Sequence, residues 1–422
     1  MKEQDLQAYL NLIKALLNSS NDYIPEIWNA YSGLVEAILQ EAAHLKSQGK
    51  LDNANGLLNI AGYVLGVYDK LSLTETPEAY VNFLLTEEAQ SIAGIIGNFC
   101  NKIREFPLEN QANNIEIAIT GYEIALTVYK SDRFPCEWAM MQYNLGNAYF
   151  YRIQGEKAKN LEQAIFYYEQ SLQVYTCHRF PYEWAKTQNN LGNAYLYRIQ
   201  GQKIQNLKRA IFFYQQALQV YTHDSLPDDW AMTQYNLGLA YSQRIQGEKA
   251  ENLEQAIFYF QQALQVYTCD AFPDKCAMTQ YNLGLAYSQR IQGEKAENLE
   301  QAIFYQQQAL QVYTCNRFPF EWARTQNNLG SAYLYRIEGE KAENLEQAIF
   351  YFQQVLQVRT RDAFPQDWAM AQYNLGLAYS KRIEGEKAEN LEQAIFFYQQ
   401  ALQVYTRNAF PEDWAKTQNN LG

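Results

Sequence analysis

The chain has 422 residues, of which 48% are apolar types and 19% are charged, so it is too hydrophobic to remain disordered. Its 46 acidic and 34 basic residues give a formal charge of −12, which disfavours nucleic acid or an anionic membrane surface as the main partner. No apolar stretch reaches the roughly 18 residues of a membrane span, and Glu3 and Asp5 argue against a secretory signal. Six cysteines without paired spacing indicate a reducing compartment, so the sequence predicts a soluble cytoplasmic protein.

Residues 1–85 lie outside any repeat and are predicted to form an acidic helical bundle. The candidate helices span residues 5–18, 25–46, 52–71 and 77–85. The last of these starts with a good signal, Thr76-Pro77-Glu78, in which a cap precedes a proline and an acid of the first turn. We expect the bundle to cap the end of the array, and a separate signalling or docking role is the alternative. Residues 86–133 are interpreted as a degenerate first repeat.

From residue 134 onward the sequence repeats every 46 residues, and this domain of residues 134–422 contains six full copies and a truncated seventh. The dipeptide Phe-Pro opens every copy except the third, which has Leu226-Pro227. Some copies are nearly identical: residues 241–268 and 287–314 differ only in Phe260 against Gln306. Several positions have therefore been copied and not individually selected.

Each copy is predicted to form two helices. In the first copy, one helix follows Pro135, covers about residues 137–153 and is ended by Gly155. The second helix is predicted to begin at Leu161, with Asn160 as N-cap in a capping box. The helical period places two sets of residues on buried faces: Trp138, Met141, Leu145, Ala148 and Tyr149, and then Leu161, Ala164, Ile165, Tyr168, Ser171, Leu172 and Tyr175. Because one pair cannot bury these faces alone, neighbouring copies must stack, which predicts an all-α solenoid.

The motif LGNAY at residues 145–149, followed by Ala164, Tyr168 and the small residue Ser171, resembles a tetratricopeptide repeat (TPR). The usual unit has 34 residues, so this form is elongated. The resemblance implies a right-handed superhelix of helix–turn–helix units. The elongated form is similar to arrays of cyanobacterial proteins in which a caspase-like CHAT protease domain follows the repeats.

The leader carries the same likeness in DLQAYLNLIKALLN (residues 5–18), TPEAYVNFLL (76–85) and EEAQSIAGIIGNF (87–99). The sequence has no such protease domain and stops inside the first helix of a repeat. We therefore expect a fragment of a longer protein.

The first helix of each copy has an aromatic and amide-rich side opposite its buried stripe, where the TPR family places its concave groove. One position on the edge of this side is asparagine in every copy. In kinesin light chains and Gram-positive peptide-pheromone receptors the matching row bonds the backbone of an extended peptide, which the resemblance implies here. The row consists of Asn144, Asn190, Asn236, Asn282, Asn328, Asn374 and Asn420. The alternative is that the amides tie neighbouring helices together or are merely duplicated.

The same side is predicted to alternate between apolar and basic-polar stations along the array. Copies three, four and six carry Met and Tyr, whereas copies two and five carry a base and Asn. The stations predicted to contact a peptide, besides the asparagines, are Tyr143, Tyr235, Tyr281, Tyr373, Lys186 and Arg324.

Two other rows recur outside the predicted groove. One consists of phenylalanines that point away from the core, at Phe166, Phe212, Phe258, Phe304, Phe350 and Phe396. We expect the lengthened return segments to cover these rings, and self-assembly through them is the alternative. The other row is Arg152 and its equivalents, predicted to lie in the last helical turn, beside the negative end of the dipole and four residues before Glu156.

No chemistry-bearing constellation is recognisable. Cys177, Cys269 and Cys315 share a repeat position with His223, but stacked equivalents should lie about 8–10 Å apart, too far for one zinc ion or a disulfide. The sequence therefore predicts no enzyme, metal or cofactor. It predicts a scaffold that binds an extended peptide or a helix, without nucleic acid or membrane as partner. The alternatives are the regulatory arm of a larger effector such as a CHAT-type protease, and structural self-assembly.

Overall fold

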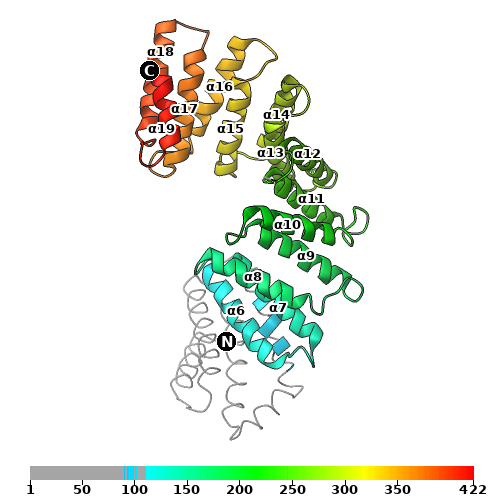
Figure 1. Cartoon of the computed structure of the whole chain (residues 1–422). Coiled ribbons are helices and arrows are strands. Elements are labelled where there is room, and N and C mark those ends of the chain that lie inside the picture. The colour runs from blue at the N-terminus through cyan, green and yellow to red at the C-terminus, as the bar shows by residue number, and fades with distance from the viewer. Residues whose placement is uncertain are drawn as a thin grey trace, which may run out of the picture. The chain divides into compact units, whose positions relative to one another are not determined.

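The computed structural model describes Gln90, residues 93–94, 96–98, 100–101 and 104, and then residues 111–244 and 246–422. The predictions for residues 1–85 lie outside the described residues. The described part is helical with connecting turns and contains no strand, so the predicted all-α class is confirmed (Figure 1).

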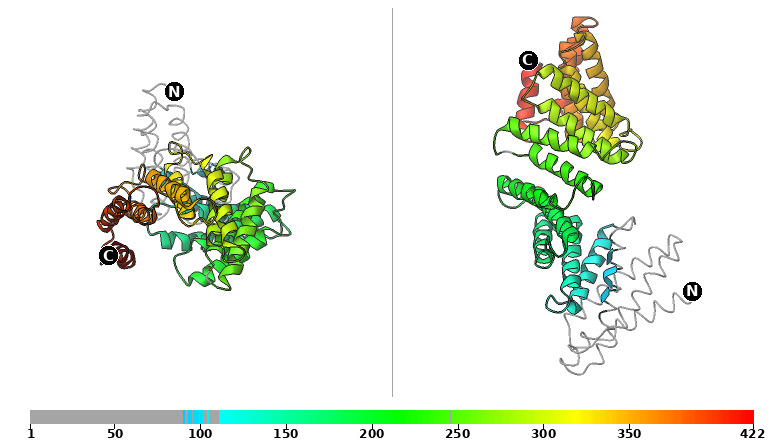
Figure 2. Two further views of the ribbon diagram at one scale, coloured as in Figure 1. Left: turned by 90° about the horizontal axis from the view of Figure 1, so that it is seen from above. Right: turned by 90° about the vertical axis from the view of Figure 1, so that its right-hand side faces the viewer.

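The described residues belong to two compact units, which divide between Val220 and Tyr221. The first unit contains α6 (Gln111–Val128), α7 (Pro135–Tyr151), α8 (Lys157–Ser171), α9 (Pro181–Leu196) and α10 (Lys203–Ala217). The second contains α11 (Pro227–Ser242), α12 (Lys249–Leu264), α13 (Pro273–Gln289), α14 (Lys295–Leu310), α15 (Pro319–Leu334), α16 (Lys341–Val355), α17 (Pro365–Lys381), α18 (Lys387–Leu402) and α19 (Pro411–Leu421). Within each unit, consecutive helices pack as the repeats of an α-solenoid (Figure 2).

The start of each first helix follows from the Phe-Pro pair. Phe134 has an extended φ of −128°, and Pro135 occupies the first helical turn, where its fixed φ is favourable and its missing N–H costs nothing. The backbone N–H of Trp138 then donates to the carbonyl of Phe134 at 2.8 Å. The same arrangement recurs at α9, α11, α13, α15, α17 and α19.

The predicted start of the second helix is wrong. Helix α8 begins at Lys157, and Asn160 lies inside it as a buried residue. The chain turns at Gly155, whose φ of +77° favours glycine, so the helix can begin four residues before Leu161. Asn160 does not cap the helix: its Nδ2 donates to the carbonyl of Gln154 at 2.8 Å and so holds the preceding turn. Local side-chain bonds of this kind are available to asparagine in turns as well as at N-caps.

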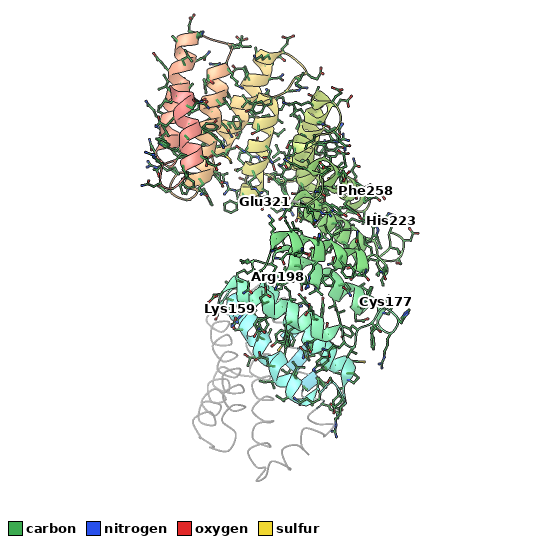
Figure 3. All side chains as sticks on the ribbon, in the orientation of Figure 1. Lys159, Cys177, Arg198, His223, Phe258 and Glu321 are labelled. Carbon is green, nitrogen blue, oxygen red and sulfur yellow. A yellow bond between two sulfur atoms is a disulfide. The ribbon has the colours of Figure 1, made fainter. Side chains whose placement is uncertain are left out.

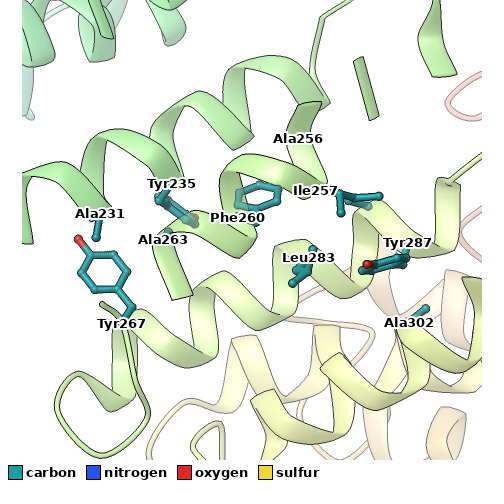
Figure 4. Packing of buried hydrophobic residues seen from close by; sticks show 11 residues of the cluster. Ala231, Tyr235, Ala256, Ile257, Phe260, Ala263, Tyr267, Leu283, Tyr287 and Ala302 are labelled. Carbon is teal, nitrogen blue, oxygen red and sulfur yellow. The ribbon is translucent and has the colours of Figure 1, made fainter. Parts of the chain in front are cut away.

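The predicted core is largely confirmed. Met141, Leu145 and Ala148 of α7 are fully buried, as are Leu161 and Ala164 of α8. In the second unit, one copy shows the same packing around Phe260 (Figure 4).

The glycine of each LGNAY-type motif has a steric cause. A Cβ on Gly146 would lie 2.5 Å from the ring carbons of Tyr168, so only glycine permits this close approach. In the third copy the corresponding contact is between Gly238 and the ring of Phe260.

The arginine row contacts partners that the sequence prediction missed. Arg152 follows the end of α7, and its guanidinium donates to both carboxylate oxygens of Glu116, each at 2.7 Å, whereas Glu156 pairs with Lys159. The hydrogen bond to Glu116 raises the pKa of Arg152. Equivalent two-pronged pairs join Arg198 to Glu162, Arg290 to Glu254, Arg336 to Glu300 and Arg382 to Glu346 (Arg198 is labelled in Figure 3). The row therefore links one copy to the preceding one, which still makes it structural.

The third copy lacks this pair. The residue 36 positions before Arg244 is Lys208 and not a glutamate. The Nε atom of Arg244 is buried and has no hydrogen-bond partner.

The expectation that return segments cover the phenylalanine row is wrong. All six rings are between 49 and 53% exposed (Phe258 is labelled in Figure 3). Each ring contacts only the edge of an aromatic neighbour in its own helix where such a contact forms, as between Phe166 and Tyr167 with centroids 5.2 Å apart. The lengthened segments instead use their own phenylalanine against a tyrosine of the same turn, as in Tyr175 and Phe180 at 5.6 Å.

The cysteines are not all unpaired, contrary to expectation. Cys269, in the turn before α13, forms a disulfide with Cys276 in the first turn of that helix, and their Cα atoms are 5.1 Å apart. The pair forms within one copy, whereas the prediction considered only stacked copies. Cys276 stands where other copies have tryptophan, and that position also meets the turn elsewhere, as in His223 and Trp230 with rings 5.1 Å apart. The redox argument for a reducing compartment therefore loses its basis.

Candidate functional site

The asparagine row lies on the first helices α7, α9, α11, α13, α15 and α17, with its last member on α19. Asn144 and Asn236 are 6 and 8% exposed, and Asn420 in the truncated copy is exposed. Asn190, Asn282, Asn328 and Asn374 are partly buried. Most of these amides are therefore less accessible than a freely available ligand-binding row would be.

Four of the amides are already bonded to the preceding copy. Asn190 Nδ2 donates to the hydroxyl of Tyr143 at 2.9 Å and to Oδ1 of Asn147 at 2.8 Å. Asn282 donates to Tyr235 at 3.0 Å, Asn374 to Asn327 at 3.1 Å and Asn420 to Tyr373 at 3.0 Å. Each of these bonds spans 47 positions, so the amide reaches the residue just before the preceding copy's asparagine. These contacts have the geometry of fasteners between copies, each contributing about 0.5–1.5 kcal/mol.

Two members of the row differ from the rest. The Nδ2 atoms of Asn144 and Asn328 are buried and have no hydrogen-bond partner. For Asn144 the cause is visible in the sequence, because the residue 47 positions earlier is Gly97, which has no side chain to accept the bond. A buried donor without an acceptor costs about 1–3 kcal/mol, so a ligand that supplies an acceptor would recover this energy.

The tyrosine stations pack against the core. Tyr143 and Tyr168 have ring centroids 6.0 Å apart, and Tyr235 and Phe260 have centroids 5.7 Å apart. Burial raises the pKa of Tyr143 to about 12, with smaller contributions from its neighbours. Tyr373 packs on a core tyrosine of its own copy in the same manner, at 5.8 Å. The tyrosine rings are thus mainly structural, and only their edges and hydroxyls are available to a ligand.

The two predicted basic stations are exposed, and each lies over the tyrosine of the preceding copy. Lys186 Nζ is 5.4 Å from the ring centroid of Tyr143, and the Arg324 guanidinium is 5.3 Å from that of Tyr281. Such cation–π contacts contribute about 0.5–1 kcal/mol at exposed sites. At the same repeat position other copies have methionine, of which Met140 and Met370 are 37% exposed. The face therefore offers both apolar and cationic contacts.

A cavity of about 570 Å³ opens on this face in the first unit. It is lined by Asn101, Arg104, Ile115, Tyr143, Asn144, Asn147, Tyr151 and Lys186. The structure therefore brings together three of the predicted site residues, Tyr143, Asn144 and Lys186. Asn101 and Arg104 were missed, although they lie 46 positions before Asn147 and Phe150 and the repeat register could have identified them.

The described residues contain no group of three His, Cys, Asp or Glu side chains positioned to hold a metal ion. None of the helices in this part of the chain combines the length and apolar character that crossing a bilayer requires.

Comparison with known proteins identifies the repeat. The Sel1 repeat family model matches residues 139–173, 185–219, 231–265, 277–311, 323–354 and 369–403. No curated protein matches the sequence.

Solved structures share the fold. The apo form of RapI is 14% identical, with a TM-score of 0.50, over 92% of this chain and 96% of that one. A Rap protein complexed with competence and sporulation factor is 13% identical, with a TM-score of 0.45, over 92% of this chain and 96% of that one. The APC/C hetero-tetramer Cut9–Hcn1 is 16% identical, with a TM-score of 0.44, over 99% of this chain and 81% of that one. At such identities the similarity concerns the fold alone.

Proposed function

Because this chain is built of six tandem Sel1 repeats of the TPR-like kind, we propose that it is a protein-interaction scaffold that binds an extended peptide or a helix on the face of its first helices. The observation that carries the proposal is the pair of buried amide donors at Asn144 and Asn328, which have no acceptor in the protein. A peptide carbonyl at either position would satisfy the donor.

The remaining asparagines have a different part in this proposal. Since Asn190, Asn282, Asn374 and Asn420 already donate to the preceding copy, they hold the face in shape and contribute little direct affinity. Affinity would come from exposed groups nearby. These are the cations Lys186 and Arg324 and the half-exposed rings of Tyr151, Tyr197 and Tyr335. Aromatic and arginine side chains are the types that most often carry binding energy at interfaces.

The proposal is tested with the double variant Asn144→Ala, Asn328→Ala. The probe is a randomised pool of twelve-residue peptides passed over the immobilised chain, with retained peptides identified by mass spectrometry. We expect the double variant to keep its helical circular dichroism spectrum and to bind the retained peptides about tenfold more weakly, as two lost hydrogen bonds of about 1 kcal/mol each imply.

The matched control is Asn282→Ala, which removes an amide already bonded to Tyr235. This variant should lose about 1 kcal/mol of stability and retain its affinity within about twofold. Equal affinity of the double variant and the wild type would refute the role of the two free donors.

Self-association is a second candidate function, favoured by the six half-exposed phenylalanine rings. A row of such rings is an unusual amount of apolar surface for a face that meets only water. Light scattering over a concentration series measures this directly, and a strict monomer at every concentration would exclude it.

The resemblance to cyanobacterial arrays supports one further reading, in which these repeats regulate a CHAT-type protease or another effector of a longer protein. The full reading frame tests it, since repeats without an effector domain would remove the idea. We propose a non-enzymatic role and a cytoplasmic location in either case, with a protein or peptide as partner and no nucleic acid or membrane, in keeping with the formal charge of −12.

A further inference from the structure

The cavity in the first unit differs in charge from the chain that surrounds it. The chain has 46 acidic residues against 34 basic ones, yet the cavity lining contains Arg104 and Lys186 and no acidic residue. Its other polar lining residues are amides and tyrosines, of which the amide nitrogens and hydroxyls donate hydrogen bonds. An enclosed site with two cations and several donors favours an anionic group.

A second observation supports a ligand at this place. Asn144 is 6% exposed, lines the cavity, and has an Nδ2 donor without a partner. In the next copy the equivalent Asn190 donates to Tyr143 and Asn147, so the protein itself supplies the acceptors there. Because Gly97 stands where other copies have tyrosine or asparagine, the space beside Asn144 receives no such acceptor from the chain. An acceptor from outside the chain fits this position.

Lys186 supplies the charge at the rim of the cavity. Its Nζ lies 5.4 Å from the ring centroid of Tyr143 and 6.0 Å from that of Tyr182, and it forms no ion pair in the described part of the chain. The aromatic rings hold the ammonium group in place without neutralising it. A planar carboxylate could therefore accept a bond from Lys186 at one oxygen and from the Asn144 amide at the other.

We propose that this cavity binds a carboxylate group of the peptide ligand and thereby anchors an acidic residue or the free C-terminus at the N-terminal end of the array. The inference rests on the proposed peptide-binding function and specifies its partner. A volume of about 570 Å³ lies within the roughly 300–1,000 Å³ of ligand pockets, so it accommodates a carboxylate together with part of the residue that bears it. The other copies that have a methionine at the Lys186 position provide apolar contacts for the rest of the peptide.

The test compares two probes on the whole chain: a randomised pool of twelve-residue peptides with a free C-terminal carboxylate, and the same pool with a C-terminal amide. Preferential retention of the free-acid pool would identify the terminal carboxylate as the anchor. Enrichment of Asp and Glu to the same extent in both pools would identify a side-chain carboxylate. Either result supports the proposal.

The key variant is Lys186→Met, because methionine is the natural residue at this position in four other copies and the helix should fold unchanged. It should weaken binding of the acidic peptides about 3- to 10-fold, whereas Lys186→Arg should retain most of the affinity. The matched control is Lys416→Met, which removes the same charge at the same repeat position outside the cavity and should change affinity less than about twofold.

The failures of the two proposals are distinguishable. Peptides retained without any preference for an acid, or unchanged binding by Lys186→Met, would overturn the carboxylate site and leave the scaffold function intact. If the wild-type chain retains no peptide from either pool, both the scaffold function and the carboxylate site are refuted.

Discussion

The substitution Gln306→Phe should stabilise the protein, because Gln306 is a polar residue in a position built for an aromatic ring. It is 1% exposed, and its Oε1 atom is buried without a partner, while its Nε2 donates to the carbonyl of Tyr281 at 3.0 Å. The preceding copy has Phe260 at this position, fully buried against Gly238, in a stretch otherwise identical from residue 241 to 268. A phenylalanine therefore has a site of the same shape at residue 306.

The magnitude follows from three contributions. Removing the unsatisfied oxygen recovers about 1–3 kcal/mol, and losing the bond to Tyr281 costs about 1 kcal/mol. Burying a phenylalanine ring contributes about 1.5–3 kcal/mol relative to leaving it exposed. We expect a net gain of about 2–3 kcal/mol in the free energy of unfolding. For a cooperative unit of this size, the gain corresponds to a rise in Tm of about 5–10 °C.

Thermal and urea unfolding followed by circular dichroism would measure the change. The reverse variant Phe260→Gln should lower stability by a similar amount, and Phe304→Gln, at a ring that is 51% exposed, should change it by less than about 0.5 kcal/mol. An unchanged or lower Tm for Gln306→Phe, with Phe260→Gln destabilising as expected, would refute the reasoning that the two copies offer equivalent sites.

Three further predictions concern the ion pairs, the tyrosines and the disulfide. Arg336→Met should lower the free energy of unfolding by about 1–2 kcal/mol because it breaks a two-pronged pair with Glu300, whereas Arg244→Met should cost less; equal losses in urea unfolding would contradict this. Burial raises the pKa of Tyr143 from its ordinary value near 10 to about 12, so the folded chain keeps a proton that the unfolded chain releases. Stability should therefore be complete below about pH 10 and fall as the pH rises toward about 12, and a tyrosinate absorbance titration that shows every tyrosine ionising near pH 10 in the folded chain would contradict it. Reduction of the disulfide should lower stability by about 2 kcal/mol in the wild type and leave Cys276→Trp unaffected, and non-reducing electrophoresis with urea unfolding would show whether it does.

The groove prediction was informative about position and less so about use. The repeat register correctly grouped Tyr143, Asn144 and Lys186, which line one cavity. It did not reveal that Asn190 spends its amide on the preceding copy, since that depends on a side chain 47 positions away in another helix. For the same reason the identity of the two free donors, Asn144 and Asn328, emerged only with the coordinates.

By itself, the sequence determined the period of 46 residues, the helix pairs, the proline that starts each first helix and the apolar faces that stack. These features depend on local backbone geometry and on residues close together in one helix, which a periodic pattern records directly. Tertiary structure decided which partner each polar side chain meets: Glu116 and not Glu156 for Arg152, and Cys276 for Cys269. Such pairings depend on distances of a few ångströms between separate elements, and near-identical repeats contain the same residue types whether a given group is satisfied by the next copy or left open to a ligand.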